Sequence, residues 1–158
     1  MRAPLLYLVM ILLVSSCSTT ELCDEDSISE LVALFKTETG GEVIDTTLSN
    51  LRIYGIREGQ STWFLYDSVA SSDILLPLDP HHDFSSFVFL ANGFSDTLTL
   101  SHSSEDYLIS FSCGFGKIFT LADDPASYEG GMIKKDTLLY PIVSTSLEED
   151  ETHIWLWF

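Results

Sequence analysis

Apolar and polar residues alternate with a period of two along most of the chain after residue 40, in short runs separated by turn residues. Leu51 and Ile53, for example, fall on one side of an extended chain, while Arg52 and Tyr54 fall on the other. Such alternation predicts β-strands that are buried on one face. We expect strands over residues 48–56, 62–66, 74–78, 84–91, 97–102, 107–112, 115–121, 132–142 and 153–158.

The segment from residue 29 to residue 39 fits two kinds of element. One face of a helix could be lined by Ile28, Leu31, Val32, Leu34 and Phe35. The run from Leu31 to Phe35 is also almost continuously apolar, as expected of a buried strand. We favour a first strand here, because the chain that follows is strand-like throughout.

The expected strands are short and lack the long helical connections of a parallel sheet. Asn92-Gly93 is a turn signal between two of them, and Asp123-Asp124-Pro125 is expected to turn the chain again. Pro77 confines its strand to a sheet edge or to a corner between sheets. The pattern predicts an all-β fold, a two-sheet β-sandwich of about eight strands, with a barrel as the alternative.

The first sixteen residues differ from the rest of the chain. An apolar run of ten residues, from Leu5 to Val14, follows the positive charge of Arg2. Ten residues are too few for a membrane-spanning helix, which needs about 20, and they fit the apolar core of a signal peptide. The leader ends in Val14-Ser15-Ser16-Cys17, which resembles the bacterial lipobox, in which the cysteine carries lipid. An ordinary signal peptide with an incidental Cys17 is the alternative.

Removal of this leader would leave one domain of ordinary size on a short tether. We expect residues 1–16 to be the lipoprotein signal peptide, residues 17–27 the lipidated spacer and residues 28–158 a single β-sandwich domain. Several acyl chains on Cys17 would make the membrane attachment close to permanent. The expected location is the cell envelope, at the outer membrane, with the periplasmic or surface face left open.

The chain is strongly acidic, with 24 acidic and 7 basic side chains and a formal net charge of −17 at pH 7. Such a surface repels phosphate backbones, which argues against nucleic-acid binding. It also repels anionic headgroups, so we expect membrane contact through the lipid and not through the protein surface. Because hydrophobic residues make up 46% of the chain, acidity does not prevent a folded core.

Three cysteines are present, and lipidation of Cys17 would leave Cys23 and Cys113 as a pair. Two remaining thiols tend to join in an oxidising compartment outside the cytoplasm. A Cys23–Cys113 disulfide would close a loop of about 90 residues and stabilise the fold by at most about 4.6 kcal/mol. Two unpaired, buried thiols are the alternative.

Short motifs over nearly the whole mature chain support a family assignment. They are Cys17 with Cys23 after it, Ile53-Tyr54-Gly55, Ile74-Leu75-Leu76-Pro77-Leu78 before Phe87-Val88-Phe89, Ile109-Ser110-Phe111-Ser112-Cys113-Gly114-Phe115 after Asp96-Thr97-Leu98-Thr99-Leu100, and the aromatic end Ile154 to Phe158. In these motifs the chain resembles an uncharacterised, domain-of-unknown-function family of small lipoproteins from Gram-negative gut-type bacteria. The resemblance implies an immunoglobulin-like sandwich with a Cys23–Cys113 disulfide, and it implies no activity.

No catalytic arrangement stands out, and we expect no enzymatic activity, cofactor or metal. His81-His82-Asp83 is the nearest to a zinc cluster, but adjacent ligands on one loop rarely complete a four-coordinate site. Glu148-Glu149-Asp150-Glu151 lacks the alternating spacing and the glycine of a calcium loop. The chain also lacks the Gly-x-Ser-x-Gly elbow of many serine hydrolases.

Tryptophans are the candidate ligand contacts, because exposed aromatic rings can stack on sugar rings. Trp155 and Trp157 should share one face of the last strand, and Trp63 lies on an earlier strand. Packing of all three in the core is the alternative.

An Asp-Ser/Thr pattern recurs five times, with its hydroxyl at Ser27, Thr46, Ser68, Thr97 and Thr137. It is similar to an O-glycosylation signal on exported proteins of some Gram-negative anaerobes. Turn-forming Asp followed by the first residues of a strand explains it equally well.

The sequence therefore predicts a non-enzymatic, lipid-anchored cell-envelope protein that acts as an accessory or protein-interaction module. Its partner would be an envelope protein or a glycan. A carbohydrate-binding module that uses Trp63, Trp155 and Trp157 is the alternative.

Overall fold

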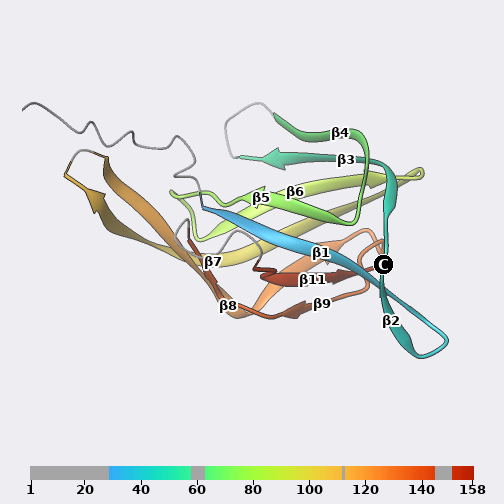
Figure 1. Ribbon diagram of the computed structural model, residues 1–158. Coiled ribbons are helices and arrows are strands. Elements are labelled where there is room, and N and C mark those ends of the chain that lie inside the picture. Colours follow the sequence, from blue (N-terminus) through green and yellow to red (C-terminus); the bar gives the residue numbers. More distant parts are fainter. Residues whose placement is uncertain (1–28, 58–62, 112, 145–150) are drawn as a thin grey trace, which may run out of the picture.

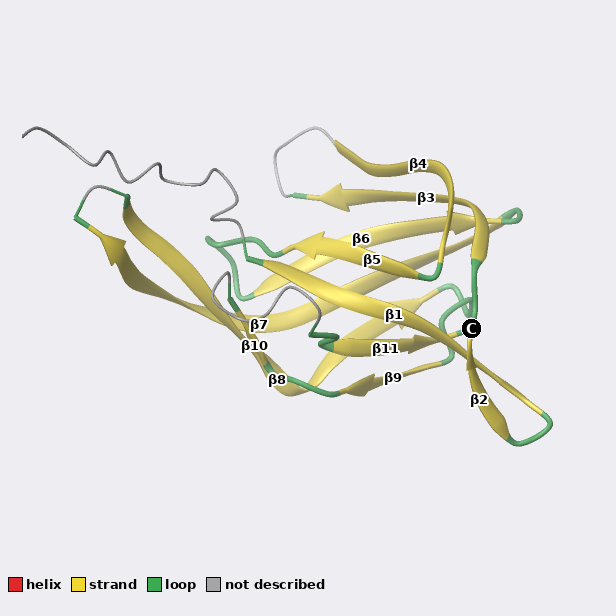
Figure 2. Cartoon of the chain, viewed as in Figure 1, coloured by secondary structure: helices red, strands yellow, loops and turns green. Residues whose placement is uncertain are grey.

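The computed structural model describes residues 29–57, 63–111, 113–144 and 151–158. Every regular element in these segments is a β-strand (Figures 1 and 2). The strands are β1 (Glu30–Thr39), β2 (Glu42–Asp45), β3 (Leu48–Ile56), β4 (Trp63–Ser71), β5 (Asp73–Pro77), β6 (Phe84–Ala91), β7 (Phe94–Ser110), β8 (Gly114–Glu129), β9 (Lys135–Leu138), β10 (Ile142–Val143) and β11 (Ile154–Trp157). Within the described segments, no helix could span a membrane.

Two sheets make up the fold. The five-stranded sheet has the order β2-β1-β11-β9, with β5 paired to β1, and the six-stranded sheet has the order β10-β8-β7-β6-β3-β4. The first strand, β1, runs parallel to the last strand, β11, with Ala33 opposite Ile154. The predicted all-β, two-sheet sandwich is confirmed, and so is the first strand expected over residues 29–39. Pro77 ends β5, which pairs only with β1, as expected of a strand at a sheet edge.

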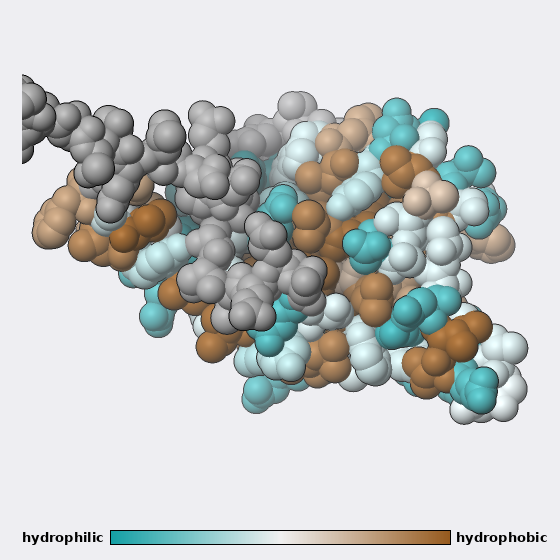
Figure 3. All heavy atoms as spheres, in the orientation of Figure 1, coloured by the Kyte–Doolittle hydropathy of each residue, from teal (hydrophilic) through white to brown (hydrophobic). Residues whose placement is uncertain are grey.

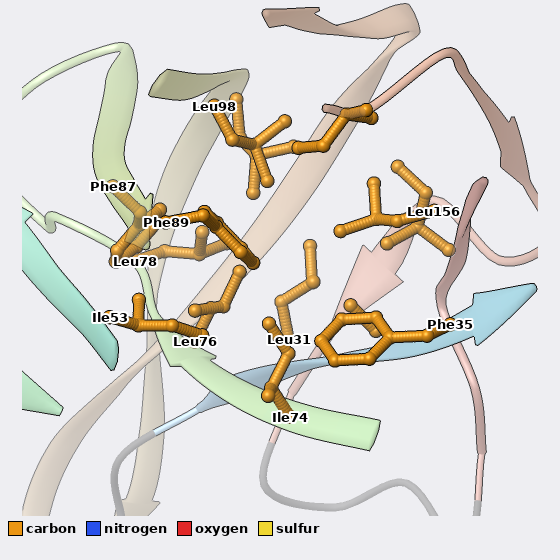
Figure 4. Packing of buried hydrophobic residues seen from close by; sticks show 14 of the residues in the cluster. Leu31, Phe35, Ile53, Ile74, Leu76, Leu78, Phe87, Phe89, Leu98 and Leu156 are labelled. Carbon is orange, nitrogen blue, oxygen red and sulfur yellow. The ribbon is translucent and has the colours of Figure 1, made fainter. Parts of the chain in front are cut away.

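The core lies between the sheets and follows from the alternation in the sequence. Leu31 and Phe35 of β1, Phe89 of β6 and Leu156 of β11 are 0% exposed. Figure 4 shows these side chains converging from both sheets. Burial of each such side chain stabilises the fold by roughly 1.5–3 kcal/mol.

The number and length of the strands differ from the prediction. Eleven strands are present in the described segments, where about eight were expected. The expected strands over residues 97–102 and 107–112 are one strand, β7, of 17 residues. The polar run Ser103-Ser104-Glu105-Asp106 between them stays extended because it pairs with β8, and none of its four side chains is buried. Polar side chains are tolerated there, so the alternation of buried and exposed residues is lost without a break in the strand.

The turn expected at Asp123-Asp124-Pro125 is wrong, because β8 continues through it to Glu129. Leu121 pairs with His102 and Ala126 pairs with Leu100, so four residues of β8 lie opposite one residue of β7. The turn-forming residues are accommodated as a bulge. Bulges, like turns, interrupt the ladder and accept residues that pair poorly.

The outer halves of β7 and β8 form a two-stranded arm, residues 105–111 and 113–118. Its pairing runs from Glu105 opposite Ile118 to Ser110 opposite Gly114, and it involves only these two strands. The arm projects from the sandwich at the left of Figure 1, and the β6–β7 turn lies at the right. The described chain begins beside the arm, where the Ser29 hydroxyl donates to the Lys117 carbonyl oxygen at 2.7 Å.

Candidate functional site

An open groove of about 570 Å³ lies where β3, β4 and the β6–β7 turn meet. Asn50 and Arg52 of β3, Ser68 of β4, Asn92 of the turn and Phe94 of β7 line it. These residues come from four places in the sequence, and the six-stranded sheet brings them together at one end. We call these five residues the groove.

The backbone of the groove is unusual. Asn50, Ser68 and Asn92 have φ angles of 52°, 58° and 52°, and they are the only non-glycine residues of the described chain in the left-handed region. Asn92 is explained by the tight β6–β7 turn that it forms with Gly93. The turn predicted from Asn92-Gly93 is thus present.

Asn50 and Ser68 have a different origin. They lie where the pairing of β3 and β4 shifts register, between Leu51 opposite Val69 and its neighbouring pairs. A left-handed L-residue costs roughly 1–2 kcal/mol. Strained positions of this kind persist where the surrounding structure enforces them, and they gather at binding sites.

The groove offers both hydrogen-bonding groups and an aromatic ring. The Arg52 Nε–H donates to the Ser68 hydroxyl and contacts the Asp67 carboxylate, each at 3.0 Å, so the guanidinium is held in place. The Phe94 ring is 69% exposed. Side-chain amides, a guanidinium and an open ring together suit a polar ligand with one apolar face.

A buried polar cluster lies under the β5–β6 connection. The Ser85 Oγ is 2.8 Å from the His102 Nε2 and accepts a hydrogen bond from the Asp79 amide at 2.7 Å. Ser85 and His102 are each 5% exposed. The sequence did not predict this meeting of Ser, His and Asp, because the three residues come from separate elements.

This cluster does not have the geometry of a catalytic triad. The Asp79 carboxylate contacts the Arg57 Nε at 2.8 Å and the His82 Nδ1 at 3.2 Å. It therefore does not orient His102, whose Nδ1 is buried without a hydrogen-bond partner. The cavity beside Ser85 holds only about 10 Å³, too little for a substrate. We interpret the cluster as the element that fixes the β5–β6 connection.

Burial decides the ionisation of the two buried histidines. Desolvation lowers the pKa of His102 below its ordinary value, against the opposing charges of Asp79 and Asp83. Desolvation likewise lowers the pKa of His153, whose Nδ1 accepts a hydrogen bond from the Val32 amide at 3.0 Å. Burial alone would raise the pKa of Asp79, but hydrogen bonds from His81, His82 and Arg57, together with the Arg57 charge, lower it.

The three tryptophans predicted as ligand contacts are divided between the two sheets. Trp155 and Trp157 belong to the five-stranded sheet, and Trp63 belongs to the six-stranded sheet. Trp155 and Trp157 share the outer face of β11, as expected, with ring centroids 6.3 Å apart. The Lys36 and Lys135 ammonium groups lie 4.7 and 4.0 Å from the Trp155 and Trp157 rings, and Trp157 is 7% exposed. Trp63, in β4, packs over Gly55, where an added Cβ would overlap the indole ring.

The proposed glycosylation acceptors are dispersed. Ser27 lies outside the described residues. Thr46, Thr97 and Thr137 are half-buried, and the Thr137 hydroxyl accepts a hydrogen bond from the Trp157 Nε1 at 3.1 Å. Ser68 is exposed and belongs to the groove.

Two of the three cysteines, Cys17 and Cys23, lie outside the described residues, so lipidation and the disulfide remain predictions. Cys113 lies between β7 and β8 at the end of the arm, where its amide donates to the Ser110 hydroxyl at 3.0 Å. Within the described segments, no group of three or more His, Cys, Asp or Glu side chains could hold a metal ion. His81, His82 and Asp83 are exposed at the surface.

Comparison with known proteins gives a family but no activity. The family model described as "Family of unknown function (DUF6452)" matches residues 50–156, more than half of the chain and all of the groove. No curated protein and no solved structure matches the chain.

Proposed function

The chain belongs to the DUF6452 family of unknown function, and we propose that it is a non-enzymatic binding module, held to the outer membrane by lipid on Cys17. The groove is its ligand site. The partner is an envelope component, either another protein or a glycan.

The layout of β7 carries this proposal. Phe94, at one end of the strand, lines the groove, and Ser110, at the other end, belongs to the arm. Sixteen residue steps separate them, roughly 50 Å in an extended strand. Ser29 contacts Lys117 at the base of the arm, so the described chain begins at the end opposite the β6–β7 turn (Figure 1), which lines the groove. A tether at this end leaves the groove directed away from the membrane.

The same layout supports the Cys23–Cys113 disulfide. Cys23 precedes Ser29 by six residues, which span at most about 20 Å. Cys113 precedes Lys117 by four residues, about 13 Å along a strand. Cys23 can therefore reach Cys113, and Cys113 has no free thiol.

Substitution of the anchor tests the proposal. Cys17→Ala should release a folded protein from the membrane into the soluble periplasmic fraction, because the lipid is lost and the fold is not. Cys23→Ala is the matched control, since it removes a nearby cysteine and should leave the protein in the membrane fraction. Cell fractionation with immunoblotting is the measurement. A Cys17→Ala variant that stays with the membrane would refute the anchor.

A glycan is the second candidate ligand, and the strained, half-apolar groove is the observation that favours it. The three tryptophans cannot form one strip because they lie in different sheets. Phe94 has the exposed ring that stacking requires, next to the hydrogen-bonding groups of Asn50 and Asn92.

Titration with soluble neutral and acidic polysaccharides tests this candidate. Phe94→Ala should weaken binding by about tenfold or more, close to 1.4 kcal/mol. Phe64→Ala is the control, because Phe64 is 65% exposed and lies outside the groove. Binding that survives Phe94→Ala, or no binding to any polysaccharide in the panel, would exclude the glycan site.

A further inference from the structure

We propose that the tip of the arm enters the membrane interface beside the lipid anchor, so that protein and lipid contact the bilayer together. The arm tip consists of Leu108 and Ile109 of β7, Phe111, and Phe115 of β8. This inference rests on the proposed lipidation of Cys17.

The arm tip is the part of the described chain where large apolar side chains are most exposed. The exposed fractions are 49% for Leu108, 39% for Ile109, 101% for Phe111 and 71% for Phe115. Figure 3 shows apolar atoms on the end of the projecting hairpin. Adjacent exposed apolar side chains of this size mark a surface that contacts another apolar phase.

The arm tip is uncharged, unlike the strongly acidic remainder of the molecule. Residues 107–116 form a stretch of ten without a charged side chain, in a chain of net charge −17. At the base of the arm the Lys117 ammonium pairs with the Asp106 carboxylate at 2.8 Å. Anionic headgroups repel the acidic body, as expected from the sequence, but they do not repel this neutral end. For the arm, this inference departs from the expectation that membrane contact involves lipid alone.

The shortness of the tether indicates that the lipid bilayer is what the arm tip contacts. Ser29 is hydrogen-bonded to Lys117, and Cys17 precedes Ser29 by twelve residues, a span of at most about 40 Å. A Cys23–Cys113 disulfide would shorten the free tether to the six residues after Cys17, at most about 20 Å. The lipid therefore holds the membrane close to Phe111 and Phe115, and apolar side chains at the interface partition into the boundary between headgroups and acyl chains.

Quenching of tryptophan fluorescence by a spin-labelled lipid tests the inference. The mature, lipidated Phe111→Trp variant is reconstituted in phosphatidylcholine vesicles that contain a phosphatidylcholine spin-labelled near the headgroup. The spin label should quench this variant clearly more than the wild type, because the added indole lies in the interface. Phe94→Trp is the matched control. It places the same indole at another exposed site, 69% exposed in the wild type and at the other end of β7, where quenching should equal that of the wild type.

The results of this experiment distinguish a failure of the membrane-contact inference from a failure of the proposed lipid anchor. If the protein floats with the vesicles but Phe111→Trp is quenched no more than Phe94→Trp, the inference is wrong and the anchor stands. If the protein carries no acyl mass and does not float, the anchor is wrong and the inference fails with it. If the tip is unquenched and a dimer forms that Phe111→Ser with Phe115→Ser abolishes, the tip binds a second copy of the chain instead.

Discussion

At the scale of single residues, the buried polar groups of this protein stabilise particular connections. The Asp96 carboxylate is 1% exposed and accepts hydrogen bonds from the Met132 and Ile133 amides, both at 2.8 Å. It thereby fixes the chain between β8 and β9. Ser85 and His102 fix the β5–β6 connection in the same manner. None of these contacts is visible in the sequence, because each joins residues from different elements.

The buried histidines give the fold a defined pH dependence. Burial lowers the pKa of His102 and His153 below the ordinary 6.5, so near pH 6 the folded protein binds fewer protons than the unfolded chain. Their contribution to the free energy of unfolding is complete above pH 6.5 and is lost as the pH falls through the lowered pKa values. Urea denaturation should show that the free energy of unfolding decreases as the pH is lowered from 7 to 5.

Substitution of one buried histidine checks this assignment. His102→Gln should make the decline of unfolding free energy with falling pH shallower, whatever its effect on stability at pH 7. His81→Gln is the control, because His81 is exposed. An unchanged slope for His102→Gln would show that His102 does not contribute to it.

At the scale of elements, most strands could be predicted from alternation, and the interruptions could not. β3 and β6 lie where expected, since their apolar faces are buried in the core. The continuity of β7 and the bulge in β8 depend on how these two strands pair with each other, which local residue types do not encode. The groove was missed for the same reason. Asn92-Gly93 was visible as a turn, but the left-handed backbone of Asn50 and Ser68 arises from the register of β3 against β4.

The arm tip should contribute to membrane contact and not to folding. Phe111→Ser combined with Phe115→Ser removes two exposed rings and should change the free energy of unfolding by at most about 1 kcal/mol. Phe89→Ala, at a site that is 0% exposed, should cost about 3–5 kcal/mol. Urea denaturation of the non-lipidated Cys17→Ala protein measures both. A large loss in the arm variant would mean that the tip packs against the domain.

At the scale of the whole molecule, the two ends of the long axis differ, with an apolar, uncharged arm tip at one end and the groove at the other. The arm and the start of the described chain lie at one end, and the β6–β7 turn, which lines the groove, lies at the other (Figure 1). An acidic body is repelled by anionic membrane, so lipid and arm together would hold this end down while the groove stays accessible. With the proposed lipid anchor, this arrangement would let a chain of such negative charge function at a membrane surface.

The intact mass of the protein, extracted from membranes with detergent, tests the lipid anchor and the disulfide together. We predict a chain that begins at Cys17, carries a diacylglycerol and further acyl mass on that residue, and has Cys23 and Cys113 joined. A chain that retains residues 1–16, or one that begins at or near Cys17 without acyl mass, would contradict the account.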